Sequence, residues 1–165
     1  MTIAGVDVKA WLVLLLFFAI CLGAGSVASW LAAHGVRDWY PALRKPKGTP
    51  PPWLFGPVWT TLYVLMAIAA WVVWRDYGWT GSRFALLLFF GQLALNVAWP
   101  GIFFGSRMLA VAFAAILVLW LAIVFTLLVF HWLRPVAGLL LIPYLFWVSY
   151  AGYLSAAIWW LNRDS

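Results

Sequence analysis

The stretch WYPALRKPKGTPPPWLFGPVW, residues 39–59, is unlike the rest of the chain. It holds six of the nine prolines, three closely spaced cations and four tryptophan or tyrosine residues. Proline fixes φ and removes a backbone donor, so a regular helix cannot run through residues 41–52. The aromatic residues are too apolar for a loose tether. We therefore predict an ordered loop that packs on its neighbours. The alternative is an aromatic belt with positive flanks at a membrane border.

The segments on both sides of this loop have the composition of membrane helices. The 165 residues are 67% hydrophobic and 8% charged, with a mean hydropathy of +1.02, whereas a soluble domain carries about a quarter charged residues. Five uncharged runs each exceed the roughly 20 residues that cross a hydrocarbon core as a helix. We expect one all-α domain over residues 1–165, a bundle of five transmembrane helices near residues 10–33, 57–74, 84–103, 108–131 and 135–161.

Two other interpretations fit the apolar runs less well. A transmembrane β-barrel has segments of about 10 residues with alternating hydrophobicity, and LVLLLFFAI at residues 12–20 does not alternate. A cleaved signal peptide has an apolar core of about 7–15 residues. The first run here continues from residue 10 to residue 33, so we expect it to remain as a helix.

The charges mark the membrane borders and give a predicted orientation. The formal net charge is +6, carried by short basic loops, which suit anionic headgroups better than nucleic acid. Six lysines and arginines fall on the loop side and four on the other, which places the long loop and the C-terminus in the cytoplasm. The loop-side cations are Arg37, Arg44, Lys45, Lys47, Arg107 and Arg163. Cys21 is the single cysteine, so the chain forms no intrachain disulfide.

The third predicted helix carries two amides near its middle. Gln92 and Asn96 are one turn apart, and Trp99 lies on the same side. Side-chain amides at this depth face a bundle interior or a cavity, or join helices as hydrogen-bonding partners. Further along, Gly101 and Gly105 form a G-x-x-x-G pattern that favours close helix contact, so we treat them as a candidate dimer interface.

Aromatic residues in two other helices favour a cavity at a similar depth. Trp59 and Tyr63 are four residues apart and share one face of the second helix. Tyr144, Trp147 and Tyr150 recur every three residues in the fifth, after Pro143, where we expect a kink. Such a stripe is usually core. Aromatic walls with a few polar groups also suit a flat conjugated ligand, and cations at the mouth can pair with its carboxylates.

Metal chemistry is not expected. The five-helix order puts His34 and His131 at opposite ends of the bundle, so they cannot hold one haem iron between them. The predicted spans contain no carboxylate at membrane depth, which argues against a proton relay and against Ser-His-Asp chemistry. We predict no resident cofactor and no metal site.

The motifs resemble those of the TspO/MBR family, the tryptophan-rich sensory proteins related to the mitochondrial translocator protein, or peripheral benzodiazepine receptor. The resemblance covers WYPALRKP, PPPWLFGPVW and TLYVLM, then GQLALNVAWPGIFFG and PYLFW, in that order. It implies a five-helix bundle, commonly dimeric. It also implies a cavity for porphyrins such as protoporphyrin IX, for haem, for cholesterol-like sterol lipids and for synthetic isoquinoline or benzodiazepine ligands.

The resemblance also assigns roles to particular residues. Trp53 and Trp147 match tryptophans linked to porphyrin handling, Asn96 and Trp99 match a polar-aromatic patch, and Ala151 matches a position sensitive to larger side chains. One departure is the C-terminal sterol-recognition pattern of the animal proteins, because no cation follows Tyr153 closely. The full candidate ligand-binding set is Trp39, Lys45, Trp53, Trp59, Tyr63, Gln92, Asn96, Trp99, Tyr144, Trp147, Tyr150 and Ala151.

Three functions are compatible with the sequence. The favoured one is a membrane receptor or transporter-like protein that binds porphyrins and other lipophilic ligands and regulates tetrapyrrole level or a stress response. The second is an enzyme that degrades protoporphyrin IX with light and oxygen, with Trp53 and Trp147 as electron donors in place of any acid–base pair. The third is a structural assembly partner that acts through Gly101 and Gly105.

Overall fold

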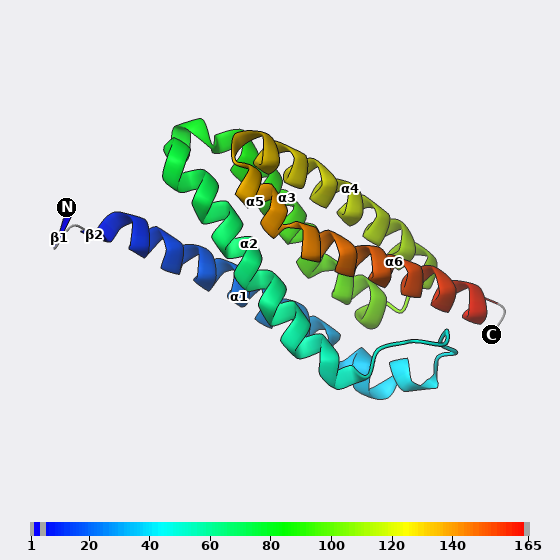
Figure 1. Ribbon diagram of the computed structural model, residues 1–165. Helices are drawn as coiled ribbons and strands as arrows, with labels where there is room; N and C mark the ends of the chain where they lie inside the picture. Colours follow the sequence, from blue (N-terminus) through cyan, green and yellow to red (C-terminus); the bar gives the residue numbers. More distant parts are fainter. Residues whose placement is uncertain (1, 4–5, 164–165) are drawn as a thin grey trace.

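The protein is a bundle of long helices, seen here in a computed structural model that describes residues 2–3 and 6–163 (Figure 1). Two short strands, β1 (Thr2–Ile3) and β2 (Val6–Asp7), pair antiparallel ahead of the first helix. The helices that follow are α1 (Val8–Asp38), α2 (Pro52–Gly81), α3 (Arg83–Pro100), α4 (Leu109–Leu133), α5 (Pro135–Leu140) and α6 (Ile142–Asn162). Two single turns accompany them, η1 (Tyr40–Ala42) and the π-helical η2 (Gly101–Gly105).

Five segments among the described residues are long and apolar enough to cross a membrane, as the sequence predicts. The third is α3 continued through η2, and the fifth is α5 continued into α6. The first two helices extend further than predicted at both ends. Helix α2 begins at Pro52, where a proline costs no intrahelical hydrogen bond. Pro57 lies in the second turn, where its missing N–H leaves the carbonyl of Trp53 without the usual i+4 donor.

The breaks between helices have local causes. Gly78 ends the regular part of α2 with φ +62°, a left-handed conformation that favours glycine, and the chain then turns into α3. The predicted kink at Pro143 is a break at Leu141, between α5 and α6. Gly138 lies directly against the backbone of His131, which lets α5 pack closely on α4.

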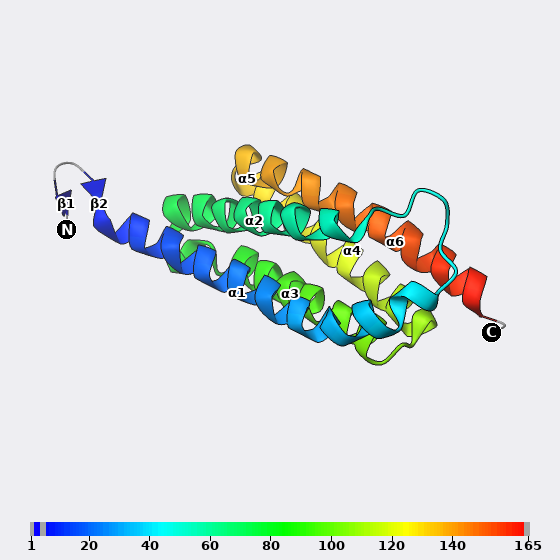
Figure 2. The same cartoon turned by 90° about the horizontal axis from the view of Figure 1, so that it is seen from below.

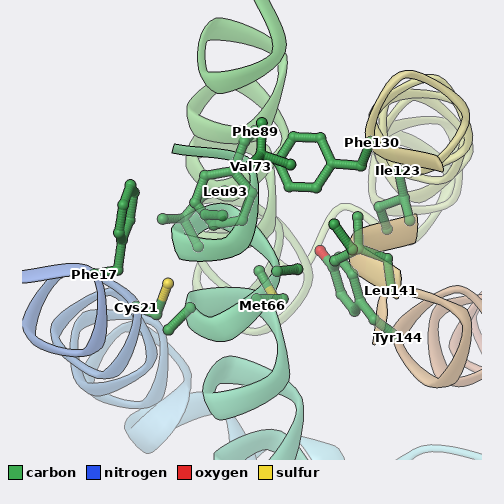
Figure 3. Packing of buried hydrophobic residues seen from close by; sticks show 14 of the residues in the cluster. Phe17, Cys21, Met66, Val73, Phe89, Leu93, Ile123, Phe130, Leu141 and Tyr144 are labelled. Carbon is green, nitrogen blue, oxygen red and sulfur yellow. The ribbon is translucent and has the colours of Figure 1, made fainter. Parts of the chain in front are cut away.

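The core draws side chains from every membrane-spanning segment (Figure 3). Phe17 of α1 contacts Phe89 of α3 edge to face, and Phe89 stacks on Phe130 of α4 with ring centroids 5.9 Å apart. Met66 of α2 is fully buried in the same cluster. In lipid, such packing replaces the hydrophobic effect as the force that holds helices together.

Small residues of α1 allow the closest helix contacts. A Cβ atom on Gly35 would lie 2.3 Å from the backbone oxygen of Phe104, so only glycine lets α1 lie against η2. Gly25 lies in the same way against the ring of Tyr63 in α2, 2.5 Å from where its Cβ atom would be. The close packing of α1 on α2 and η2 therefore depends on these two glycines.

The long loop is ordered and packs on the bundle, as predicted. It lies at the same end of the bundle as the C-terminal end of α6, while the start of α1 lies at the other end (Figures 1 and 2). Asn162 of α6 holds the loop by two hydrogen bonds to the backbone of Arg44, one donated and one accepted. Tyr150 donates to the carbonyl of Gly48 at 2.7 Å.

An ion-pair cluster joins the helices at the opposite end. Asp76 near the end of α2 accepts hydrogen bonds from Arg75 and from Arg134, the residue between α4 and α5. Tyr77 donates to the carbonyl of Leu133 at 2.7 Å. These contacts tie the α2–α3 turn to the α4–α5 turn.

Candidate functional site: a groove between α2 and α6

A groove with a volume of about 570 Å³ lies between α2 and α6. Helix α5 packs against α2, and α6 then separates from α2 toward the loop end of the bundle (Figure 1). The groove is open on one side and its lining is almost wholly apolar. Its walls are Pro57, Val58, Thr61 and Leu62 from α2, and Pro143, Phe146, Trp147 and Tyr150 from α6.

Trp147 is the aromatic centre of the α6 wall. Its ring meets the ring of Phe55 edge to face at 5.7 Å and lies 6.2 Å from the ring of Tyr150. The indole Nε1 is buried and has no hydrogen-bond partner among the described residues. Because Tyr150 is bonded to Gly48, the loop approaches the groove at the Tyr150 end.

Behind the groove, four polar side chains form a buried hydrogen-bonded chain. Tyr63 donates to Asn96 at 2.6 Å, Asn96 donates to Tyr144 at 2.9 Å, and Tyr144 donates to Gln92 at 2.9 Å. All four are at most 4% exposed. The chain links α2, α3 and α6, so the amides of α3 face the interior as expected and serve as interhelical hydrogen-bonding partners. None of the four lines the groove itself.

Trp59 connects the buried chain to the groove region. It is half-buried, 5.7 Å from the ring of Tyr63 and 6.2 Å from that of Tyr144. The neighbouring Val58 lines the groove. Trp59 thus covers the tyrosines of the chain at the end nearer the loop.

Other predicted site residues lie elsewhere. Trp39 and Trp99 belong to a second aromatic cluster around Phe103, beneath the start of the loop. Trp99 also donates from Nε1 to the carbonyl of Ala112, which ties α3 to α4. The ammonium of Lys45 stays within the loop, where it donates to the carbonyls of Pro41 and Leu43.

The two candidate interface glycines face different surroundings. Gly101 lies toward Leu31 of α1 in the same chain, 3.7 Å from where its Cβ atom would be, whereas Gly105 is exposed with open space above it. Within residues 2–3 and 6–163, no three His, Cys, Asp or Glu side chains gather as a metal site would require.

Comparison with known proteins agrees with this architecture. The model of the TspO/MBR family matches residues 17–161. The tryptophan-rich protein TspO of Archaeoglobus fulgidus is 40% identical over 141 residues, which cover 86% of this chain and 91% of that protein. The chain belongs to the TspO/MBR family. The translocator protein of Homo sapiens is 38% identical over 84% of this chain and 82% of its own length. The tryptophan-rich sensory protein of Cereibacter sphaeroides is 38% identical over 92% of each chain. With its five membrane-spanning segments, this TspO/MBR protein is an integral membrane protein.

The residues that the family resemblance singles out are divided in this TspO/MBR protein. Trp147 lines the groove, and Ala151 is partly buried and packs against the main core one turn further along α6. Trp53 stands at the start of α2, 70% exposed. Asn96 lies in the buried chain and Trp99 in the second cluster, so the structure brings only part of this set to one place.

Six groove residues were missing from the predicted set, although a sequence signal for them existed. Residues 57, 58, 61 and 62 follow the i, i+1, i+4, i+5 spacing of one helix face, and residues 143, 146, 147 and 150 follow the i, i+3, i+4, i+7 spacing. Both faces are apolar apart from Thr61 and Tyr150. The spacing alone does not distinguish a groove wall from a face that contacts lipid, so the sequence predicts only Trp147 and Tyr150 among the groove residues.

Proposed function

We propose that this TspO/MBR protein is a membrane receptor that binds a flat lipophilic ligand, a porphyrin such as protoporphyrin IX or haem, in the α2–α6 groove. The observation that carries the proposal is the groove itself, about 570 Å³ of apolar space with Trp147 and Tyr150 on one wall. Ligand pockets range from about 300 to 1,000 Å³ and are mostly apolar with a few polar groups. Aromatic faces favour stacking with a conjugated ring system.

The loop supplies the charge that a porphyrin dicarboxylate requires. Lys45 is engaged with two loop carbonyls, whereas Lys47 is exposed and precedes Gly48, the residue bonded to Tyr150 at the groove. We therefore assign the carboxylate-pairing role to Lys47 in preference to Lys45. Charge-assisted hydrogen bonds of this kind are roughly twice as strong as neutral ones.

Sterol-like lipids and isoquinoline or benzodiazepine ligands are expected to compete for the same apolar walls. A homodimer remains a prediction. If two copies of the protein pair, we expect Gly105 to lie at their interface, because it has open space above it, whereas Gly101 already faces α1 of the same copy.

Two adjacent threonines of α2 provide a matched test. Thr61 lines the groove and Thr60 does not, yet both are exposed and both donate to the carbonyl four residues earlier. Thr61→Phe should fill the groove and weaken protoporphyrin IX binding by about tenfold or more, a loss of about 1.4 kcal/mol. Thr60→Phe should bind like the wild type. Titration of detergent-solubilised protein with protoporphyrin IX, followed by the porphyrin's own fluorescence, measures both. Equal affinities of the two variants would place the ligand elsewhere.

A further inference from the structure

A second concave site lies at the loop end of the bundle, on the side formed by α4 and α6. It has a volume of about 310 Å³ and lies where α4 begins and α6 ends, and the two helices pack together there (Figure 2). Phe113 stacks on Trp159 across this contact, with ring centroids 5.8 Å apart. Both helix ends are ends of membrane-spanning segments, so the site lies at the level of the lipid headgroups.

Two arginines from different parts of the chain line this hollow. Arg107 comes from the α3–α4 turn and Arg163 follows α6. Each guanidinium lies over an indole, Arg107 at 5.9 Å from the ring of Trp39 and Arg163 at 3.6 Å from that of Trp160. Stacking uses the flat face of a guanidinium, whereas its N–H donors lie along the edge, in a fork that matches phosphate oxygens.

The start of α4 adds a third source of positive potential. Helix α4 has 25 residues, and no side chain caps its N-terminus at Met108. Its first N–H groups therefore lack an intrahelical partner, and the helix dipole favours a negative charge beside them. Leu109 and Ala110, the first residues of α4, belong to the lining of the same hollow.

The rim of the hollow is apolar. Met108 and Val111 line the site and are 54% and 45% exposed, and the neighbouring Leu161 is 41% exposed. A free phosphate ion would gain nothing from these side chains. A phospholipid has a phosphate that can contact the two arginines and acyl chains that can contact the apolar rim.

We propose that the hollow between the start of α4 and the end of α6 is a binding site for the phosphate diester of an anionic phospholipid, held by Arg107 and Arg163. This site is separate from the α2–α6 groove, which shares no lining residue with it. Lipid bound here would hold the ends of α4 and α6 together.

The test compares two double variants that each remove two positive charges at the same end of the bundle. Arg107→Asn/Arg163→Gln alters the hollow, and asparagine suits the left-handed backbone of position 107, where φ is +58°. Arg37→Gln/Arg44→Gln is the control, since neither residue lines the hollow. Native mass spectrometry in detergent then counts dioleoyl phosphatidylglycerol, dioleoyl phosphatidylcholine or inorganic phosphate retained by each protein.

Wild type and control should retain phosphatidylglycerol in preference to phosphatidylcholine. The hollow variant should bind phosphatidylglycerol about tenfold less tightly, since hydrogen bonds to charged groups are the strong ones. If the hollow variant and the control variant lose phosphatidylglycerol equally, the lipid is held by diffuse surface charge, and the proposed site is wrong. Equal retention of the two lipids would do the same. Inorganic phosphate bound as tightly as the lipid would overturn the lipid assignment.

A second variant pair covers the case in which the neutral hollow variant does not fold, which its thermal unfolding midpoint in detergent reveals. Arg107→Lys/Arg163→Lys keeps both charges and loses the planar fork, so it should retain phosphatidylglycerol less well than the wild type. The matched control is Arg37→Lys/Arg44→Lys. If both lysine pairs retain the lipid as well as the wild type does, bidentate recognition in the hollow is refuted.

Discussion

Removal of one hydroxyl from the buried polar chain should measurably destabilise the bundle. Tyr144 accepts a hydrogen bond from Asn96 and donates one to Gln92, and it is 1% exposed. Tyr144→Phe removes both bonds and little volume. It also leaves the Gln92 amide without any partner among the described residues, because Nε2 of Gln92 already has none.

The expected cost follows from the number of bonds broken. Hydrogen bonds between membrane helices contribute about 0.6 kcal/mol on average and up to about 1.7 kcal/mol. Tyr144→Phe should therefore cost about 1–3 kcal/mol of unfolding free energy. Tyr63→Phe breaks one bond, to Asn96, and should cost about 0.5–1.5 kcal/mol on the same basis.

Reversible unfolding in mixed micelles with increasing sodium dodecyl sulfate provides the assay, with helix content read by circular dichroism. Tyr153→Phe is the control, since Tyr153 is 56% exposed on the same helix. The double variant Tyr63→Phe/Tyr144→Phe should be non-additive by about 0.5 kcal/mol or more, because both hydroxyls bond to Asn96. If Tyr144→Phe is no more destabilising than Tyr153→Phe, the buried hydrogen bonds among Tyr63, Asn96, Tyr144 and Gln92 do not hold the helices together.

Four further outcomes are expected. Gly35→Ala should destabilise the fold by about 1–3 kcal/mol through overpacking against a backbone oxygen. Gly23→Ala, with open space around it, should be neutral or slightly stabilising in the same unfolding assay. Asp76→Asn should cost at most about 1 kcal/mol per arginine partner, since both arginines are about half exposed, and added salt should shrink the difference. In a Cys21→Ala background, Lys47→Cys should react with an impermeant maleimide only in inverted vesicles or lysed cells; labelling in intact cells would reverse the predicted orientation.

The number and order of the helices could be predicted because charge spacing reports membrane borders directly. Each uncharged run had to cross the lipid, so the five spans followed from five runs. Helix ends were less accurate. The second helix was expected to begin near Pro57 and begins at Pro52, since the three consecutive prolines at 50–52 end the loop in an extended conformation that leads into a helix.

The candidate site was harder to predict, because polar residues in a membrane helix show which face is buried but do not show where a cavity lies. Gln92 and Asn96 were placed in the interior by the cost of an amide in lipid, and they are there. The cost of burying an amide is met equally by hydrogen bonds to other side chains and by hydrogen bonds to a ligand. The structure supplies side-chain partners for both, and the groove opens nearby on a face that carries one tyrosine and one threonine among apolar residues.

The aromatic residues of α6 explain how one helix contributes both to the buried hydrogen-bonded chain and to the wall of the groove. Three residues advance an α-helix by about 300°, so each step of three falls about 60° short of a full turn. Tyr144, Trp147 and Tyr150 therefore wind around α6 and do not form a straight ridge. Tyr144 is buried in the polar chain, Trp147 is half-buried in the groove wall, and Tyr150 reaches the loop. A spacing of three thus joins the interior, the groove and the loop through one rigid helix. The bonds that fix Tyr144 against α3 consequently also fix the orientation of Trp147 toward the groove.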